Sequence, residues 1–271
     1  MAREKRIEKS KTDVAIVNVD KNNITQYAPT CFLNPNNEGY QTKLRWIMKR
    51  FSEGLKIKLL YSGDKAKCNG FIEYVPGEYA WRAVDAKGYM FVHCIWISPN
   101  KYKKKGYGSL LVKECINDAK QHGKIGVAVV TSEGPFMAGI ELFLKNGFKS
   151  VAQANPSYEL MIKTFRKGSL PRFKDWEKQL HKYKGLNIIY SNQCPWVARS
   201  INELTEIAKK RGLKLKIIEL KSAKQAQNAP SPYAVFNLVC DGRLLVDHYV
   251  SARRFQNILD KEIKKEIPPL Y

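Results

Sequence analysis

The first 165 residues carry hydrophobic periodicities that predict an ordered succession of strands and helices. Six segments alternate like strands or form short apolar runs, and 90–98 is the most apolar of them, as a central strand should be. The predicted strands are 13–19, 57–61, 68–76, 90–98, 124–132 and 158–165. Apolar residues recur at helical spacing in 40–55, 109–123 and 136–148. This order predicts an α/β (α+β) fold.

The pattern is interrupted at 166–184, which is polar and basic with an early Gly and Pro. We interpret this stretch as a linker with a helical turn or two, between a first domain at 1–165 and a second at 185–271. In the second domain the predicted strands are 186–190, 213–220, 232–239 and 243–250. The predicted helices are 195–212 and about 251–266, with a short helical connection before Asn228. The result is a small βαβαββα unit.

The net charge of +22 is spread evenly over the chain. Residues 1–165 carry 26 Lys and Arg against 15 Asp and Glu, and residues 166–271 carry 21 against 10, so each part is +11. Such a charge suits nucleic acid, an acidic membrane surface or a phosphorylated cofactor. A charge run is more often a solvated surface that confers solubility. We expect no membrane partner, and charge alone does not favour nucleic acid.

The spacing of the cysteines and the lengths of the apolar runs indicate in which cellular compartment the protein is expected. The chain has no CxxC pair and only four histidines, so no metal site is expected. The first 20 residues lack an apolar targeting segment, and no stretch reaches the roughly 18 apolar residues of a membrane helix. We expect a soluble protein of a reducing compartment, the cytoplasm, with free thiols.

A glycine-containing loop, "SPNKYKKKGYGSLL" at 98–111, joins the most apolar strand to a helix. The first turn of a helix has unpaired backbone N–H groups, and the helix dipole favours negative charge there. Gly106 and Gly108 lack a Cβ, so the backbone can adopt positive φ and approach a ligand closely. The lysines before them attract phosphate. These properties predict an anion site at the start of the helix.

Several kinds of site contain such a loop. A Walker loop requires GxxxxGK[ST] and a Rossmann loop GxGxxG, and neither is present. A nuclear signal requires a mobile exposed segment, whereas this one lies between a buried strand and a helix. Tyr102 and Tyr107 provide aromatic groups for nucleic acid, but no other nucleic-acid signature accompanies them. A pyrophosphate cradle fits the context best.

The stretch 95–108 resembles the acetyl-CoA loop of the GNAT superfamily of N-acetyltransferases. The family signature is a strand that ends in an apolar residue and often Pro, followed by Q/R-x-x-G-x-G/A. Here it reads "ISP" at 97–99 and "KKKGYG" at 103–108, with Lys in the first position. The order of elements across 13–165 also matches the family. The resemblance implies the GNAT mixed sheet flanked by helices and acetyl-CoA as cofactor.

The same resemblance implies how the cofactor is held. The strand before the loop splays from its neighbour, backbone groups of Ile95 and Ile97 pair with the pantetheine amides, and 103–109 hold the pyrophosphate. The implied cofactor-binding residues are Ile95, Ile97, Lys103, Lys104, Lys105, Gly106, Tyr107, Gly108 and Ser109. The implied reaction is attack of a neutral amine on the thioester carbonyl, which requires a base for the amine and an acid for the leaving thiolate.

One position departs from the family pattern. Members often carry a tyrosine as general acid in "LYxKxGF", whereas this chain has Phe143, which has no proton to donate. The catalytic candidates are then His93 as base and Ser132, Tyr158 or water as acid. The alternatives are that His93 is a satisfied core histidine, and that the domain transfers slowly or only binds CoA.

The second domain places Cys194-Pro195 at a strand-to-helix junction, where Pro suits the first helical turn and the helix N-terminus lowers the thiol pKa. The unit resembles a thioredoxin or glutaredoxin fold, which implies a cis peptide bond at Ser231-Pro232 facing Cys194. Position 197 is Val, so CxxC is absent and a dithiol cycle within this motif is excluded. Monothiol chemistry at Cys194 and an inherited fold reused for binding both stay open.

An acetyltransferase domain followed by such a unit resembles the YoaP-like GNAT proteins. This resemblance implies an acyltransferase (EC 2.3.1) that moves an acetyl group from acetyl-CoA to a primary amine of a small molecule or peptide, with the C-terminal domain shaping the substrate end. The alternative is a CoA-binding protein with a monothiol redox or binding role at Cys194.

Overall fold

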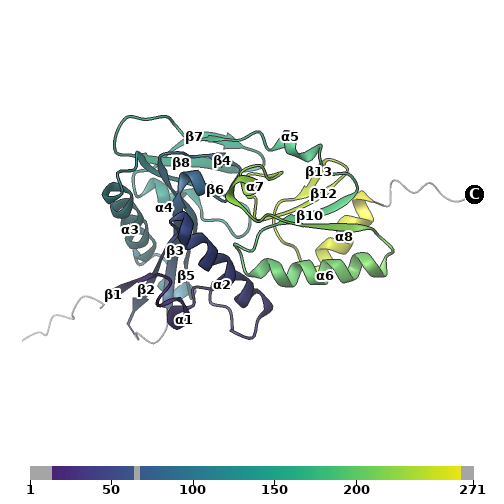
Figure 1. The fold of residues 1–271 in the computed structure, drawn as a ribbon, viewed down its shortest axis with the longest axis horizontal. Coiled ribbons are helices and arrows are strands. Elements are labelled where there is room, and N and C mark those ends of the chain that lie inside the picture. Colours follow the sequence, from purple (N-terminus) through teal and green to yellow (C-terminus); the bar gives the residue numbers. More distant parts are fainter. Residues whose placement is uncertain (1–13, 64–67, 264–271) are drawn as a thin grey trace, which may run out of the picture.

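The computed structural model describes residues 14–63 and 68–263. The first 13 residues of the predicted first domain lie outside the described residues, as does the end of the second domain with the helical turn expected at 264–266. The chain forms two main sheets that lie next to each other along the long axis of the molecule (Figure 1).

The N-terminal part is built around a seven-stranded sheet with the order β1-β2-β3-β5-β6-β8-β7. Its strands are β1 (Val14–Val19), β2 (Lys56–Ser62), β3 (Cys68–Pro76), β5 (Tyr89–Ile97), β6 (Gly126–Ser132), β7 (Lys149–Ala154) and β8 (Tyr158–Thr164). All neighbours are antiparallel except β5 and β6, which are parallel. The predicted α/β fold with a mixed sheet is confirmed. β7 was not predicted because this largely exposed edge strand, "KSVAQA", has no apolar face.

Helices cover both faces of this sheet. The helices and short 3-10 turns are α1 (Ile24–Tyr27), α2 (Glu38–Arg50), η1 (Phe51–Glu53), η2 (Gly77–Tyr79), η3 (Asn100–Tyr102), α3 (Tyr107–Gln121) and α4 (Ile140–Leu144). α3 buries Leu111 and Cys115 on one face, and α2 buries Trp46 and Ile47 on the other. The helix predicted at 136–148 is shorter, since the chain becomes helical only after Gly139.

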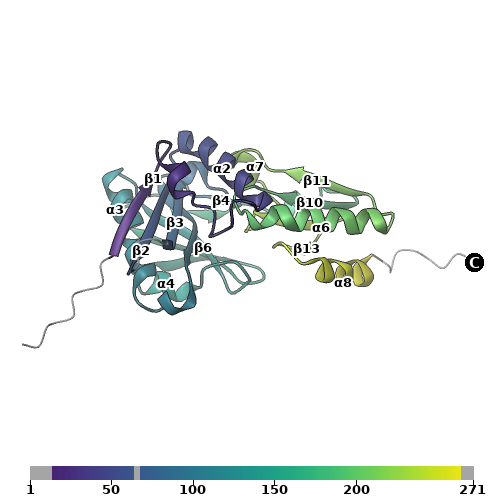
Figure 2. The same cartoon turned by 90° about the horizontal axis from the view of Figure 1, so that it is seen from below.

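The C-terminal part has a four-stranded sheet with the order β11-β10-β12-β13. Its elements are β10 (Leu186–Tyr190), α6 (Trp196–Lys210), β11 (Leu215–Glu219), α7 (Ala223–Ala226), β12 (Phe236–Cys240), β13 (Arg243–Val246) and α8 (Ala252–Glu262). β10 is parallel to β11 and antiparallel to β12. Asp241 and Gly242 both have positive φ, as a type I′ hairpin turn requires. The helices α6 and α8 lie together on one side of the sheet (Figure 2).

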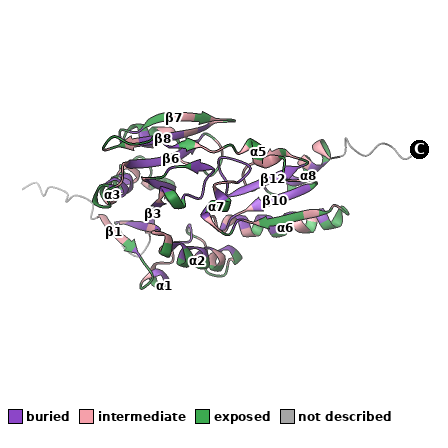
Figure 3. Cartoon of the chain, turned by 45° about the horizontal axis from the view of Figure 1, so that its top comes forward, coloured by how far each residue is buried: buried purple, intermediate pink, exposed green. Residues whose placement is uncertain are grey.

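The two parts share a continuous core. The predicted linker contains β9 (Arg172–Phe173), which pairs with β4 (Val84–Asp85), and the single turn α5 (Glu177–Leu180). One apolar cluster joins Leu160 of the N-terminal sheet to Ile188 of the C-terminal sheet. Buried strands lie on both sides of the boundary, whereas α6 carries much exposed surface (Figure 3). The predicted linker is therefore packed against the N-terminal part of the chain through β4 and the shared apolar cluster.

β5 and β6 separate halfway along their length. The first half of β5 pairs with the first half of β6, as far as Val92 and Val129, and beyond these residues the strands are no longer partners. A bulge at His93 shifts β5 against β3, so that Val92 and Cys94 face consecutive β3 residues. The end of β5 thus borders an opening in the sheet, just before the glycine loop.

Candidate active site

A groove of about 1080 Å³ opens where β5 ends and α3 begins. We call it the β5–α3 groove. Its walls come from the end of β5, the glycine loop and the segment around α4. The predicted cofactor residues that line it are Ile95, Ile97, Lys103, Lys104, Gly106, Gly108 and Ser109. Lys105 and Tyr107 do not line it.

The N-terminus of α3 borders this groove without a side-chain cap. Gly106, the residue before the helix, has a φ of 82°, in the left-handed region where glycine is favoured. The first turn contains no acidic residue, and no atom lies within 4 Å of the position that a Cβ on Gly106 would take. The arrangement therefore fits an anionic group bound by backbone N–H groups.

The two predicted cofactor residues outside the groove make other contacts. Tyr107 is buried, and its hydroxyl lies 2.6 Å from Oγ of Ser62, which ties the start of α3 to β2. The ammonium of Lys105 lies 5.5 Å from the centre of the Tyr102 ring. This geometry favours a structural part for Tyr107, while Lys105 adds positive charge beside the groove.

A second hollow, the interdomain cavity, lies between the two parts of the chain and has a volume of about 60 Å³. β5 and β6 line it where they separate. The C-terminal part contributes Gln193, Cys194, Trp196, Tyr233, Val235 and Tyr249. The residues that line both the groove and the cavity, which we call the junction, are Cys94, Ile95, Trp96, Phe136, Met137 and Ala138. The groove and the cavity therefore adjoin at the opening of the sheet.

Charged side chains form one wall of the cavity. Nζ of Lys43 donates to Oε2 of Glu73 at 2.5 Å, and both side chains are 2% exposed. Gln193 donates to the other Glu73 oxygen at 3.3 Å and accepts from Nη1 of Arg82 at 2.6 Å. Burial opposes ionisation of Glu73, but the ion pair with Lys43 brings its pKa down to about 2. This network joins the two parts across the cavity.

His93 is a neutral side chain with one hydrogen-bonded ring nitrogen, while the other lies near Glu73 without forming a hydrogen bond. Its Nε2 accepts from the backbone N–H of Trp81 at 2.9 Å, so the ring proton is on Nδ1, which lies 3.4 Å from Oε1 of Glu73. Burial lowers the pKa of His93 to about 4, although Glu73 opposes this shift. Because the lone pair of Nε2 is engaged by Trp81 and Nδ1 carries the proton, no lone pair is free to take a proton from an amine, and the geometry favours the interpretation of His93 as a core histidine.

Acid is expected to destabilise the protein in two steps. The pKa of His93 is 6.5 in its ordinary state and about 4 here, so the unfolded chain binds the extra proton and stability is lost as the pH falls from 6.5 towards 4. Glu73 adds a second loss from pH 4.5 towards about 2. Urea unfolding between pH 7 and about 2 measures both losses of stability. A His93→Gln variant should lack the first loss. If the free energy of unfolding fell with the same slope between pH 6.5 and 4 in both proteins, the first loss would not belong to His93.

The structure corrects two predictions for the thiol site. Cys194 lies just before α6, but burial raises the pKa of its thiol to about 11 despite the N–H of Trp196, so the helix N-terminus does not produce a thiolate at neutral pH. Cis peptide bonds are present at Ser98–Pro99 and Asn155–Pro156, and the Ser231–Pro232 bond is not cis. Pro232 also does not line the cavity. These observations do not support the thiol-redox alternative.

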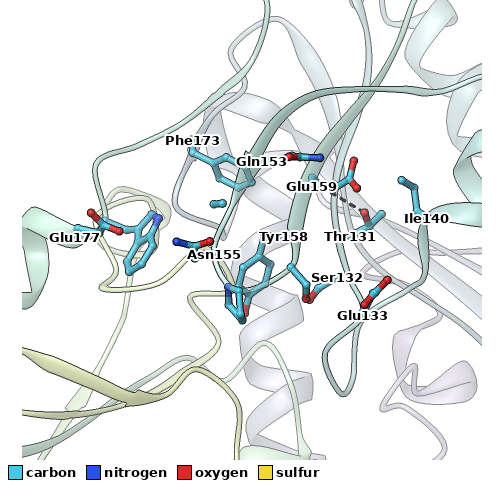
Figure 4. Close-up of a pocket in the computed structure, with 14 residues that line it drawn as sticks. Thr131, Ser132, Glu133, Ile140, Gln153, Asn155, Tyr158, Glu159, Phe173 and Glu177 are labelled. Atoms are coloured by element: carbon cyan, nitrogen blue, oxygen red, sulfur yellow. Dashed lines mark hydrogen bonds between the residues drawn. The ribbon is translucent and has the colours of Figure 1, made fainter.

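Ser132 and Tyr158, the predicted acids, lie in a different hollow, which is drawn in Figure 4. This hollow of about 600 Å³ shares no lining residue with the β5–α3 groove or the interdomain cavity. Oγ of Ser132 lies 2.8 Å from Oγ of Ser157, and the Tyr158 hydroxyl donates to Asp247 at 2.5 Å. Both hydroxyls are thus engaged by other side chains and line neither the groove nor the cavity, so their positions do not favour a part in acetyl transfer.

Several residues of the cavity were not singled out from the sequence. They are Lys43, Glu73, Arg82, Gln193, Tyr233 and Tyr249. Phe136, predicted on a helix, lies in the loop before α4 and stacks on Tyr249 with ring centres 4.0 Å apart. Phe143 is fully buried against Phe148, so the position of the usual tyrosine acid belongs to the apolar core.

Comparison with known proteins identifies the family. Residues 22–148 match the model of the Acetyltransferase (GNAT) family, and residues 214–257 match the YoaP-like model. The "Uncharacterized N-acetyltransferase YoaP" of Bacillus subtilis (strain 168) is 31% identical over 250 residues, which cover 90% of this chain and 98% of that relative. The chain therefore belongs to the GNAT family of acetyltransferases. It is an N-acetyltransferase with acetyl-CoA as its cofactor. The likeness of its C-terminal part to thioredoxin stays a prediction.

Solved acetyltransferases are similar at low identity. A putative acetyltransferase, yncA of Salmonella typhimurium with acetyl-CoA, is 17% identical and covers 59% of this chain and 98% of its own, with a TM-score of 0.43. Spermidine N-acetyltransferase of Vibrio cholerae, in complex with CoA and spermine, is 12% identical over 56% of this chain and 95% of its own, with a TM-score of 0.40.

Two features are not found in the part of the chain that the structure describes. Its His, Cys, Asp and Glu side chains form no group of three or more that could hold a metal ion. None of its helices combines the length and apolar character needed to cross a membrane.

Proposed function

We propose that the chain transfers the acetyl group of acetyl-CoA to a primary amine of a small molecule or peptide, and that the reaction takes place at the junction. The observation that carries this proposal is that the two hollows adjoin and share six lining residues. A groove suited to an anionic cofactor thus borders, at its other end, a space between the two domains. A thioester held in the groove would therefore meet an amine held in the cavity.

The groove supports cofactor binding along its length. Acetyl-CoA supplies an activated acetyl group when it is bound. The N–H groups at the start of α3, together with Lys103 and Lys104, suit its pyrophosphate. Ile95 and Ile97 lie on the half of β5 that β6 no longer covers, where backbone groups can bond to pantetheine amides. These residues thereby position the reacting end of the cofactor at Cys94.

The cavity supports binding of a slender amine. Its volume of about 60 Å³ has room for the amine end of an acceptor and excludes a bulky body. Trp96, Trp196 and Val235 give it a largely apolar lining, which favours the neutral form of an amine over its ammonium form. The C-terminal domain closes the side of the cavity opposite the separated strands.

The rate of transfer is expected to follow the fraction of neutral amine. Among the described residues that line the cavity, Glu73 and His93 are the only carboxylate and imidazole, and their pKa values of about 2 and about 4 make both poor bases. We therefore expect kcat/KM for an alkylamine to rise about tenfold per pH unit below the amine pKa of about 10. A plateau with an apparent pKa between about 6 and 7 would instead reveal a base.

The experiment that tests the proposed function is release of the CoA thiol across an amine panel. The panel contains amino acids, polyamines and amine-bearing antibiotics, and mass spectrometry checks each reaction for the acetylated amine. We expect at least one primary amine to increase thiol release, with an equal amount of N-acetyl product. Thiol release at the same rate with and without every amine would contradict the proposal.

A further inference from the structure

Tyr233 brings an unpaired hydroxyl into the interdomain cavity from the C-terminal domain. It lies between α7 and β12, is 4% exposed and lines the cavity. Its hydroxyl makes no hydrogen bond to another described residue, and it is not one of the fully buried polar atoms that lack a partner, so the oxygen itself keeps contact with open space. The hydroxyl is therefore available to a group that enters the cavity.

Arg82 fixes this ring beside the opening of the sheet. Its guanidinium carbon lies 5.1 Å from the centre of the Tyr233 ring. Nη2 of the same group donates to the carbonyl oxygen of His93 at 2.8 Å, at the bulge where β5 leaves β6. Arg82 is 3% exposed, so its position is set by these contacts. The chain of contacts thus connects Tyr233 to the residue that precedes Cys94 of the junction.

Few hydroxyl groups at the cavity can supply a proton; the Lys43 ammonium there is held by Glu73. Phe143 has none to donate and lies in the apolar core. Tyr233 and Tyr249 carry the only hydroxyls among the described side chains that line the cavity. The Tyr249 ring is stacked on Phe136, whereas the Tyr233 ring faces the positive charge of Arg82. The positive charge of Arg82 stabilises the phenolate that is left when the hydroxyl gives up its proton, which favours Tyr233 as the donor.

We propose that Tyr233 is the proton donor to the leaving sulfur, so that the C-terminal domain completes the active site. This inference rests on the proposed function. The amine nitrogen forms a C–N bond with the acetyl carbon while the C–S bond breaks, and the sulfur takes the hydroxyl proton of Tyr233. The proton lost by the nitrogen returns to the phenolate oxygen. The products are the N-acetyl amine and the CoA thiol, with no other reactant consumed.

The protonation state of Tyr233 agrees with this role. Burial raises the pKa of Tyr233 above its usual range, with Arg82 opposing the shift, so the hydroxyl is protonated before each turnover. The contribution of the hydroxyl to the rate should therefore be the same at neutral and at mildly alkaline pH. A phenol that had to ionise first would contribute only at high pH.

A Tyr233→Phe variant tests this role, because it removes only the hydroxyl. We expect kcat with acetyl-CoA and an accepted amine to fall about 100-fold at neutral and at mildly alkaline pH. KM for both substrates should stay within about threefold of the wild-type values. The matched control is Tyr89→Phe, which removes a buried hydroxyl without a partner from a residue that lines neither the groove nor the cavity. Its kcat should equal that of the wild type.

The outcomes separate this inference from the proposed function. A wild type that acetylates no amine would overturn the proposed function. An active wild type with an equally active Tyr233→Phe variant would overturn only the inference. A loss carried by KM or by a lower melting temperature would show a structural part for Tyr233 and would also overturn it. A Tyr249→Phe variant whose kcat falls further than that of Tyr233→Phe would likewise overturn the inference.

Discussion

Replacing Lys43 with methionine is expected to lower the free energy of unfolding by about 3–5 kcal/mol. Lys43 and Glu73 form an ion pair in which each side chain is only 2% exposed. Without the ammonium, the Glu73 carboxylate would be left buried with Gln193 and the neutral His93 as its remaining polar neighbours. An uncompensated buried charge is strongly unfavourable, and protonating it at neutral pH also costs free energy. Urea unfolding at neutral pH measures the difference.

Two further variants make this result specific. Lys178 and Asp175 form an ion pair at 3.0 Å with side chains 80% and 52% exposed, so Lys178→Met should cost less than about 1 kcal/mol. The double variant Lys43→Met/Glu73→Gln removes both charges and should recover at least about half of the single-variant loss. If Lys43→Met destabilises the protein no more than Lys178→Met, the buried ion pair does not hold this wall of the cavity.

Replacing Gly106 with tryptophan is expected to weaken acetyl-CoA binding by at least about 100-fold, or about 2.8 kcal/mol. Gly106 lines the β5–α3 groove, and the position that a Cβ would take there has no atom within 4 Å. An indole therefore fits into the open space and covers the N–H groups at the start of α3. Because those groups and the helix dipole are what suit the pyrophosphate, the variant loses the anion site. Calorimetric titration with acetyl-CoA measures the effect.

Backbone strain is separated from this effect by a matched glycine. Gly106 has a φ of 82° and Gly212 a φ of 67°, so tryptophan is strained at both positions, and the Cβ position at Gly212 is also open. Gly212 follows α6 and lines none of the hollows described above. Gly212→Trp should lose a similar amount of stability and keep its affinity for acetyl-CoA. Equal affinities in the two variants would contradict the assignment of the groove.

The sequence predicted much of the fold because the strands that form the core have strong apolar patterns. The run 90–98 corresponds to β5, and Gly106 in the loop after it is the residue immediately before α3. β7 was missed because an exposed edge strand needs no apolar face. The helix predicted from residue 136 begins at Ile140, since Phe136 has a φ of 66° and packs on Tyr249 of the other domain. That contact is tertiary, and no local pattern reports it.

The cofactor half of the site was predictable, whereas the cavity was not. Two of the three walls of the groove, the end of β5 and the glycine loop, come from one continuous stretch of chain, whose glycines and lysines are visible in the sequence. The cavity instead depends on contacts between distant segments, such as Gln193 with Glu73 and with Arg82. The prediction of a lowered thiol pKa for Cys194 was wrong because burial raises this pKa more than the helix N-terminus lowers it. The extent of burial depends on how distant parts of the chain pack together. Tyr233 carried no signal, because an unpaired hydroxyl can be recognised only in the folded chain.

The most direct test of acetyl transfer at the junction is a crystal structure of the chain with acetyl-CoA. The account predicts the pyrophosphate at the start of α3, the pantetheine along Ile95 and Ile97, and the acetyl group beside Cys94 with the interdomain cavity in front of it. An acetyl group bound elsewhere, for example in the hollow that contains Ser132 and Tyr158, would contradict the account.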